Sequence, residues 1–211
     1  MNPEATLQTF QFDDYHVRAY VPDALLLQQW FKAQQKANPS FPSPYWAQVW
    51  PAARALCRFI AQQPHWIQHK KVLELAAGLG LPSLLAAQFA SEVISSDNIE
   101  EAVESIQQSI EYNGFQNMQS CVLDWNALPP GLTADVLLVS DINYEPAVFE
   151  TIYKVIEKFL NAGTVIMLST PQRLMAKPFI ERLVPFCILQ KEITVKEPLP
   201  ETICTVMLLK K

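Results

Sequence analysis

Residues 72–80 combine an apolar run, a carboxylate and two glycines in an order suited to holding a ligand. The run reaches Glu74 and then breaks at Gly78 and Gly80, beside Ala76 and Leu79. Glycine accepts positive φ values, and the absence of a Cβ lets backbone N–H groups approach ligand atoms. The pattern predicts a buried strand that bends into a tight loop against a nucleoside-bearing cofactor.

Polar and aromatic residues follow the other predicted strands. Because ligands of open α/β sheets bind at the carboxyl ends of the strands, the further candidates are Asp97, Asn98, Asp124, Trp125, Ser140, Asp141, Tyr144 and residues 169–171. Asp97 suits hydrogen bonds from both ribose hydroxyls, or it only caps a helix. Asp124 suits a contact with the edge of an adenine, and Trp125 suits an indole wall beside it. Alternatively, the two residues only form a turn at the strand end, with Trp125 packing there.

Strands and helices alternate around these candidates. Strands are expected around Glu74 and at residues 92–96, 121–123, 136–139 and 164–168, and helices at 82–90, 98–113, 149–160 and 175–183. Asn98 with Glu101 resembles a capping box, and Asn113-Gly114 is a helix stop. This order predicts an α/β fold with a mostly parallel sheet covered on both faces. Two last strands, at 188–195 and 202–209, are joined too closely for a crossover and must form a terminal antiparallel hairpin.

An extension precedes the sheet. Residues 6–21 predict a small hairpin around Asp13-Asp14, and residues 25–36 predict a helix. Four prolines and several aromatic rings follow in residues 38–51, where the rings either plug the core or cover a cofactor. We therefore divide the chain into an N-terminal segment, residues 1–51, and one globular unit, residues 52–211.

Composition argues against several classes of protein. The chain has 211 residues, half of them apolar, and a net charge of −5 that gives no electrostatic footprint for nucleic acid. No apolar stretch approaches the roughly 20 residues that span a bilayer. The four separated cysteines indicate reduced thiols and a cytoplasmic protein. His65 and His69, on an expected helix end, suit a polar face rather than a metal site. We expect no metal, no nucleic acid, no membrane, and a monomer or weak homodimer.

Taken together, these motifs resemble a known family. The ordered set of Glu74-x-Ala76-x-Gly78-x-Gly80, Asp97, Asp124-Trp125 and Ser140-Asp141-x-x-Tyr144 is similar to class I, Rossmann-like, seven-β-strand S-adenosylmethionine-dependent methyltransferases. The Pro44-Tyr45-Trp46-Ala47-x-x-Trp50-Pro51 segment narrows the resemblance to methyltransferase family 16, which includes protein lysine methyltransferases. Within that family it is most similar to the branch acting on the β subunit of electron-transfer flavoprotein.

The resemblance implies a cofactor, S-adenosylmethionine, a product, S-adenosylhomocysteine, and a role for each motif. Residues 76–80 would cradle the methionine moiety above Glu74, with Asp97, beside Asn98, on the ribose. The backbone of 123–125 and the Asp124 side chain would meet the adenine, and Trp50 would cover the cofactor. Asp141 and Tyr144, after Ser140, would border the methyl group and orient a neutral amine. Ala76 stands where glycine is usual; a Cβ is tolerable there if φ is negative, with a tighter cradle and lower affinity.

Several functions remain open at this point. Protein lysine N-methylation is the favoured function, and a small-molecule amine is an alternative acceptor. A nicotinamide-dependent oxidoreductase is a second alternative, although the third glycine of its fingerprint would fall at Ser83. A cofactor-binding protein without activity is a third.

Overall fold

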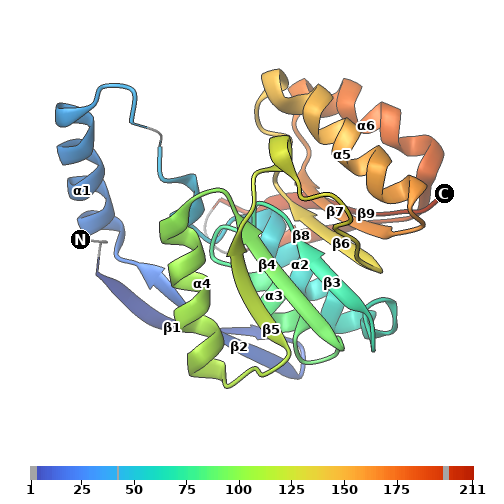
Figure 1. Ribbon diagram of the computed structural model, residues 1–211, viewed down its shortest axis with the longest axis horizontal. Coiled ribbons are helices and arrows are strands. Elements are labelled where there is room, and N and C mark those ends of the chain that lie inside the picture. Colours follow the sequence, from blue (N-terminus) through green and yellow to red (C-terminus); the bar gives the residue numbers. More distant parts are fainter. Residues whose placement is uncertain (1–3, 42, 197–199) are drawn as a thin grey trace.

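The computed structural model describes residues 4–41, 43–196 and 200–211. These residues contain a sheet with the strand order β5-β4-β3-β6-β7-β9-β8 (Figure 1). The parallel strands are β3 (Lys71–Glu74), β4 (Glu92–Asp97), β5 (Met118–Val122), β6 (Val136–Ser140) and β7 (Val165–Pro171). Strand β9 (Thr202–Leu209) runs antiparallel to β7 and to the edge strand β8 (Cys187–Val195). The predicted seven-stranded α/β fold with its terminal hairpin is confirmed.

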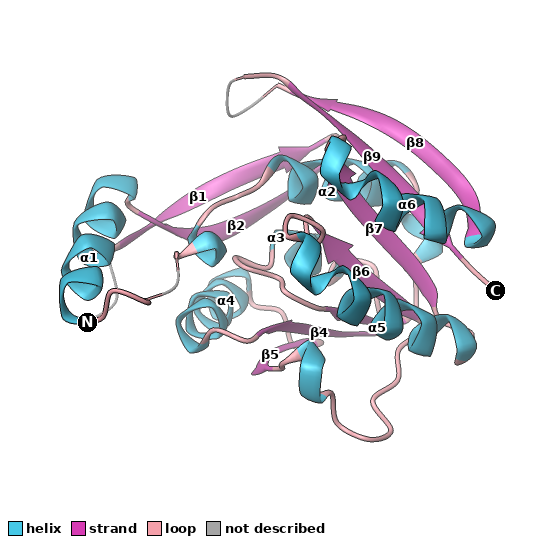
Figure 2. Ribbon diagram, turned by 90° about the horizontal axis from the view of Figure 1, so that it is seen from above, coloured by secondary structure: helices cyan, strands magenta, loops and turns pink. Residues whose placement is uncertain are grey.

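Helices cover both faces of this sheet. One core cluster contains residues of α2 (Pro51–Gln62), α3 (Leu81–Ala86) and α4 (Glu100–Asn113), and another contains residues of α5 (Phe149–Asn161) and α6 (Lys177–Leu183). Strand β3 serves both, because successive side chains of a strand point to opposite faces: Val72 lies in the first cluster and Leu73 in the second. Figure 2 shows α5 and α6 side by side next to β6 and β7.

Several helices differ from the sequence prediction, and α3 ends at Ala86 rather than at residue 90. No element was expected over α2, which buries most of its residues; Pro51 occupies its first turn, where proline is tolerated. The predicted capping box at Asn98 is wrong. Helix α4 has Ile99 as its N-cap, and the Asp97 carboxylate accepts the Ile99 N–H at 3.1 Å. At the other end Gly114, with φ +72°, is the expected stop.

The N-terminal extension packs against the sheet's helices. Strands β1 (Ala5–Phe12) and β2 (Tyr15–Pro22) form the expected hairpin, followed by α1 (Ala24–Ala37) and the 3-10 helix η1 (Tyr45–Ala47). The backbone N–H of Tyr20 donates to Ser109 Oγ on α4 at 3.0 Å. In Figure 1 α1 stands apart from α5 and α6. The division at residue 51 stays a prediction, although α2 begins there.

Short 3-10 helices lie in several loops after the strands. They are η3 (Trp125–Ala127) after β5, η4 (Pro146–Val148) after β6, η5 (Leu174–Ala176) after β7, and, elsewhere, η2 (Pro64–Trp66) and η6 (Val184–Phe186). Among the residues described, none of the helices combines the length and the apolar character needed to span a bilayer.

Gly80 should be the glycine on which folding depends most. It has φ +66°, and a Cβ added there would lie 3.0 Å from Ser95 Oγ and 3.1 Å from Ile106 Cγ1. We expect Gly80→Ala to lower the free energy of unfolding by about 2–4 kcal/mol, because backbone strain adds to overpacking. Gly114→Ala is the matched control, since its φ is +72° with no atom within 4 Å. Equal losses for the two variants in urea titrations would contradict the steric argument.

Candidate functional site

The glycine loop follows β3 and has an unusual backbone. Ala76, Gly78 and Gly80 have φ values of +52°, +57° and +66°. The condition under which a Cβ would be tolerated without strain at position 76, a negative φ, is therefore not met. A left-handed alanine costs roughly 1–2 kcal/mol, because its Cβ approaches the following carbonyl oxygen.

Asp97 fixes this loop from the neighbouring strand. Its Oδ2 accepts the Gly78 N–H at 2.8 Å, and Oδ1 accepts the N–H of Ile99. The Ala77 N–H also donates to Ser96 O at 2.9 Å. Burial raises the pKa of Asp97, and the hydrogen bonds from Gly78 and Ile99 oppose that shift. Asp97 is therefore more than a helix cap, because it also holds the glycine loop.

Glu74 lies beneath the loop and is fully buried. One of its oxygens, Oε2, accepts hydrogen bonds from the Ser83 N–H at 3.0 Å and from the Ser83 hydroxyl. The other, Oε1, is buried without a hydrogen-bond partner. Burial raises the pKa of Glu74 to about 8 against the opposing effect of Ser83. Near neutral pH this side chain is therefore mostly protonated and ties the end of β3 to α3.

Three predicted cofactor residues line one small cavity. Ala76, Asn98 and Trp125 surround it together with Leu75 and Leu123, and its volume is about 20 Å³. Small-molecule sites typically measure about 300–1,000 Å³. A nucleoside would therefore have to move one wall of this cavity outward.

The side chain of Asp124 is engaged in its own turn. Its Oδ1 accepts the backbone N–H of Asn126 at 2.8 Å and the Asn126 side-chain amide at 2.7 Å. It thereby caps η3 and fixes the position of Trp125, which is partly buried against the α5–α6 cluster. The structure shows the turn that the sequence allowed; an adenine contact remains a prediction.

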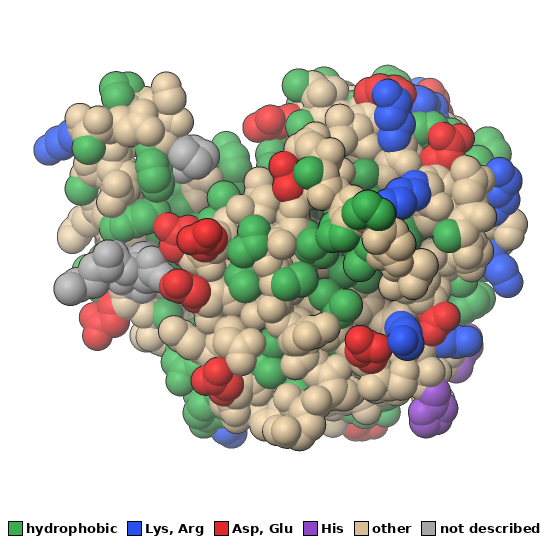
Figure 3. Space-filling model, in the orientation of Figure 1, with side chains coloured by type: hydrophobic (Ala, Val, Ile, Leu, Met, Phe, Trp, Pro, Cys, Tyr) green, Lys and Arg blue, Asp and Glu red, His purple; other side chains and the backbone are tan. Residues whose placement is uncertain are grey.

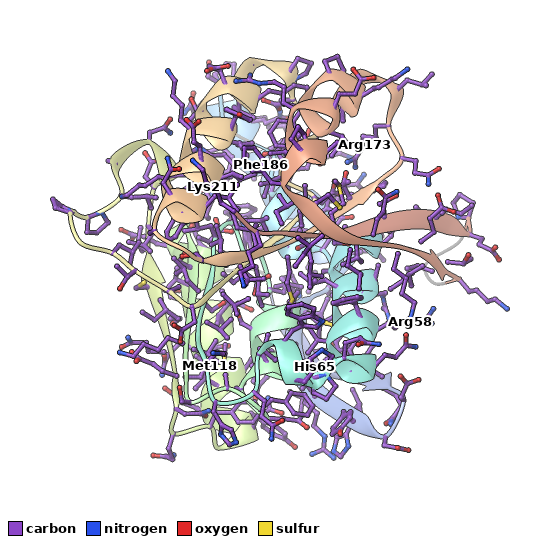
Figure 4. All side chains as sticks on the ribbon, turned by 90° about the vertical axis from the view of Figure 1, so that its right-hand side faces the viewer. Arg58, His65, Met118, Arg173, Phe186 and Lys211 are labelled. Atoms are coloured by element: carbon purple, nitrogen blue, oxygen red, sulfur yellow. The ribbon has the colours of Figure 1, made fainter. Side chains whose placement is uncertain are left out.

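Asp141 is held by an arginine that the sequence analysis did not single out. Its carboxylate accepts a hydrogen bond from Arg173 Nη1 and a second, at 3.0 Å on Oδ2, from Nη2. Asp141 has φ +57° and follows the half-buried Ser140 at the end of β6. Figure 4 labels Arg173 on the segment after β7. The sequence signal that could have identified this residue is the position of Arg173 just after the strand-end residues 169–171.

Tyr144 belongs to a row of aromatic rings. Its ring centroid lies 5.7 Å from that of Tyr45, which lies 6.3 Å from that of Trp50. Trp50 Nε1 donates to Tyr45 O at 2.8 Å. Burial, followed by the charges of Glu145 and Asp97, raises the pKa of Tyr144, so its hydroxyl is neutral at physiological pH. The row brings the N-terminal segment and the β6 end together, and Tyr45 was not among the predicted site residues.

Trp46 brings that segment onto the glycine loop. A Cβ on Gly78 would lie 3.1 Å from Trp46 O, so the close approach requires glycine. The side chain of Leu79 packs with Trp46 and Leu27 in a cluster of buried side chains, and its expected contact with the cofactor stays a prediction. Of the two roles left open for this segment, packing is observed for Trp46, whereas Tyr45 and Trp50 are partly exposed.

Other candidate sites contain none of the predicted residues. Another cavity, of about 520 Å³, lies between β1, α2 and the end of β8. His65 lies in η2, whereas His69 follows it in a turn with φ +59°, so the expected shared helix end is wrong. Within residues 4–41, 43–196 and 200–211, no three His, Cys, Asp or Glu side chains are grouped to hold a metal.

The raised pKa of Glu74 predicts that the free energy of unfolding depends on pH. Its folded pKa is about 8 and its ordinary value 4.5. Its contribution is therefore fully present below pH 4.5 and is lost as pH rises through about 8, at up to about 1.4 kcal/mol per pH unit between these values. We expect Glu74→Gln to flatten the fall in unfolding free energy between pH 5 and 8 in urea titrations. Parallel curves for the two proteins would refute a protonated Glu74.

Ala76→Gly should relieve strain in the loop. Glycine adopts φ +52° without the Cβ penalty, but it costs up to about 1 kcal/mol of chain entropy, so we expect a gain of up to about 1 kcal/mol. The buried neighbour Ala77 has no positive φ, so Ala77→Gly should be destabilising. Thermal unfolding of both variants checks the contrast, and a loss of stability in Ala76→Gly would be the contrary result.

Comparison with known proteins gives a consistent family. A family model described as lysine methyltransferase, methyltransferase family 16, matches residues 43–184. Human histone-arginine methyltransferase METTL23 is 34% identical over 129 residues, which cover 57% of this chain and 66% of that protein. The electron transfer flavoprotein beta subunit lysine methyltransferase of Danio rerio is 31% identical over 143 residues, 64% of this chain and 54% of that protein. The matches cover between 42% and 66% of the length of such curated relatives.

Solved structures share the fold at low identity. The 16S rRNA N2 G1207 methyltransferase of T. thermophilus, in complex with AdoMet and guanosine, aligns over 100% of this chain and 51% of its own, with a TM-score of 0.65 and 17% identity. A structure described as a putative RNA methyltransferase from Pyrococcus horikoshii aligns over 79% of this chain and 89% of its own, with a TM-score of 0.59 and 18% identity. These likenesses concern the fold alone. Because the family model covers well over half of the sequence, the chain belongs to the lysine methyltransferase family, methyltransferase family 16.

Proposed function

We propose that this protein transfers a methyl group from S-adenosylmethionine to the side-chain amine of a lysine in another protein. The observation that carries the proposal is the union of a glycine loop held by Asp97 with the Asp141–Tyr144 motif in a chain of this family. A flavoprotein-subunit lysine methyltransferase and a protein N-lysine methyltransferase, METTL21A, are among its relatives.

The loop and its neighbours fit such a cofactor. A carboxylate offers about four acceptor positions; in Asp97 the backbone N–H groups of Gly78 and Ile99 occupy two, and that of Asn98 also acts on it. Asp97 therefore keeps acceptor capacity for a ribose hydroxyl. We assign Ala76, Leu79 and Asn98 to the same pocket through their backbone or side chain, with Glu74 supporting the loop from below.

The remaining cofactor contacts follow from the surrounding strand ends. Asp124 and Trp125 would border the adenine, Ser140 would approach the methionine moiety, and Trp50 would cover the cofactor. When bound, S-adenosylmethionine supplies a methyl group on a positively charged sulfur that is already activated for transfer. The protein mainly has to align the acceptor and exclude water.

Asp141 and Tyr144 orient the acceptor in this proposal. The amine must be neutral, because an ammonium has no lone pair to attack with. Arg173 occupies two acceptor positions of Asp141, so about two remain for the N–H groups of a neutral amine. The rings of Tyr45 and Tyr144 offer an apolar wall to the alkyl chain. Acidic side chains gather beside a central group of hydrophobic ones on the face in Figure 3, which suits a basic protein partner.

Arginine is the second candidate acceptor, because METTL23 relatives are named histone-arginine methyltransferases. A guanidinium pairs best with a carboxylate that can take two parallel hydrogen bonds. Asp141 already makes such a pair with Arg173, which favours lysine. We also propose a cytoplasmic protein, supported by four free cysteines among the described residues; a monomer or weak homodimer stays a prediction.

Radiolabelled S-adenosylmethionine added with a size-separated lysate tests the proposal. We expect label in a discrete protein band, recovered as methyl-lysine after acid hydrolysis. Label recovered as methyl-arginine would select the second candidate. Label confined to the small-molecule fraction, or removed by ribonuclease, would refute a protein acceptor.

The Asp141→Ala variant tests the role of this carboxylate in turnover separately from cofactor binding. It should lower turnover strongly, by about 100-fold on the usual scale of an orienting group. S-adenosylhomocysteine binding, measured by calorimetry, should stay close to the wild-type value. Wild-type turnover in this variant would remove Asp141 from the mechanism.

A further inference from the structure

The Asp141–Arg173 pair is a built feature rather than a chance surface contact. The Asp141 side chain is 8% exposed and that of Arg173 is 29% exposed, and two parallel hydrogen bonds join them. Asp141 has φ +57°, a conformation that non-glycine residues rarely adopt. Such a conformation persists only where the surroundings enforce it.

Hydrogen bonds between the ends of β6 and β7 hold Asp141 in this conformation. The Asp141 N–H donates to Ser169 O at 2.9 Å, and Thr170 Oγ1 donates to Asn143 Oδ1 at 2.7 Å. Asn143 and Thr170 are buried, so the bond between them is shielded from water. The chain segments at the ends of β6 and β7 are therefore joined at two points next to the ion pair, which holds Arg173 near Asp141.

The other titratable groups near the pair are neutral or of the same sign as Asp141. Cys204 on β9 is a neutral thiol, because burial and then the charge of Asp141 raise its pKa to about 11. Tyr144 keeps its proton, and the charges of Glu145 and Asp97 act on it from the β6 loop and β4. Within the described part of the chain, Arg173 is the cation in ion-pair contact with Asp141.

We propose that Arg173 is a positioning residue that keeps the acceptor amine in its neutral, reactive form by balancing the charge of Asp141. This inference rests on the proposed function. The lysine ammonium first gives one proton to water. In the transfer step the nitrogen lone pair then forms the N–C bond, the S–C bond breaks with its electron pair left on sulfur, and the positive charge passes from sulfur to the methylated nitrogen. Asp141 orients the N–H groups, whereas Arg173 prevents the carboxylate from stabilising an ammonium.

The expected size of this effect is large. A lysine amine has an ordinary pKa of about 10.4, so only a small fraction is neutral near pH 7. An unbalanced carboxylate within about 4–6 Å would raise that pKa by roughly 1–3 units. The neutral fraction would then fall about 10- to 1,000-fold, since each unit changes it tenfold.

The pH dependence of turnover tests the proposal. With the protein labelled in the preceding experiment as acceptor, we expect Arg173→Gln to lower kcat at pH 7 by at least about 10-fold and to move the pH midpoint upward by about 1–3 units. Arg173→Lys, which keeps the charge, should leave the midpoint within about half a unit of wild type. A kcat loss of the same factor at every pH would show a merely structural role and overturn the proposal.

A double variant and a binding probe complete the test. Asp141→Asn with Arg173→Gln removes both charges and should return the midpoint toward that of wild type, even if turnover stays low. In the presence of S-adenosylhomocysteine, n-butylammonium should bind Arg173→Gln at least about 10-fold more tightly than wild type at pH 7, by NMR titration. Equal binding would refute charge balancing without reference to turnover. If wild type methylates nothing while the probe still discriminates, the proposed function fails and the charge balance stands.

Discussion

The carboxylate of Asp97 joins the two backbone segments from which the site is built. One oxygen holds Gly78 in the loop after β3, and the other holds Ile99 at the start of α4. Hydrogen bonds to an ionised acceptor are roughly twice as strong as neutral ones, and these are sheltered because Asp97 is 5% exposed. This anchoring helps explain how the loop sustains Ala76 in a left-handed conformation. Conformations of this kind need surroundings that over-determine them.

Glu74 and Asp97 end adjacent strands, but their environments give them different charges and roles. Asp97 receives backbone N–H groups on both oxygens, whereas Glu74 has one oxygen without a partner and no exposure. Burial without full hydrogen bonding disfavours ionisation, so Glu74 acts as a neutral link to Ser83. Two carboxyl side chains thus have different roles: Glu74 supports the loop from below as a neutral group, and Asp97 anchors it from the side through hydrogen bonds.

Local patterns explain why much of the fold could be predicted. The apolar run that ends at Glu74 identifies β3, and the close spacing of β8 and β9 requires a hairpin. Helix α2 was not predicted although local signals were present, namely Pro51 in its first turn and an apolar side that includes Leu56, Phe59 and Ile60. The capping prediction at Asn98 failed because the adjacent Asp97 carboxylate, fixed by tertiary contacts, accepts the Ile99 N–H. The pairing of Asp141 with Arg173 and that of Tyr45 with Tyr144 join distant parts of the chain, so no local pattern encodes them.

The contact between Gly78 and Trp46 uses a backbone oxygen, and this has an evolutionary consequence. A main-chain contact constrains the path of the chain but not the side chain of the neighbouring Tyr45, which is 50% exposed. Substitutions at Tyr45 can therefore accumulate without disturbing the loop next to it. Under the proposed function, this separation lets the choice of acceptor change while the loop after β3 keeps its shape.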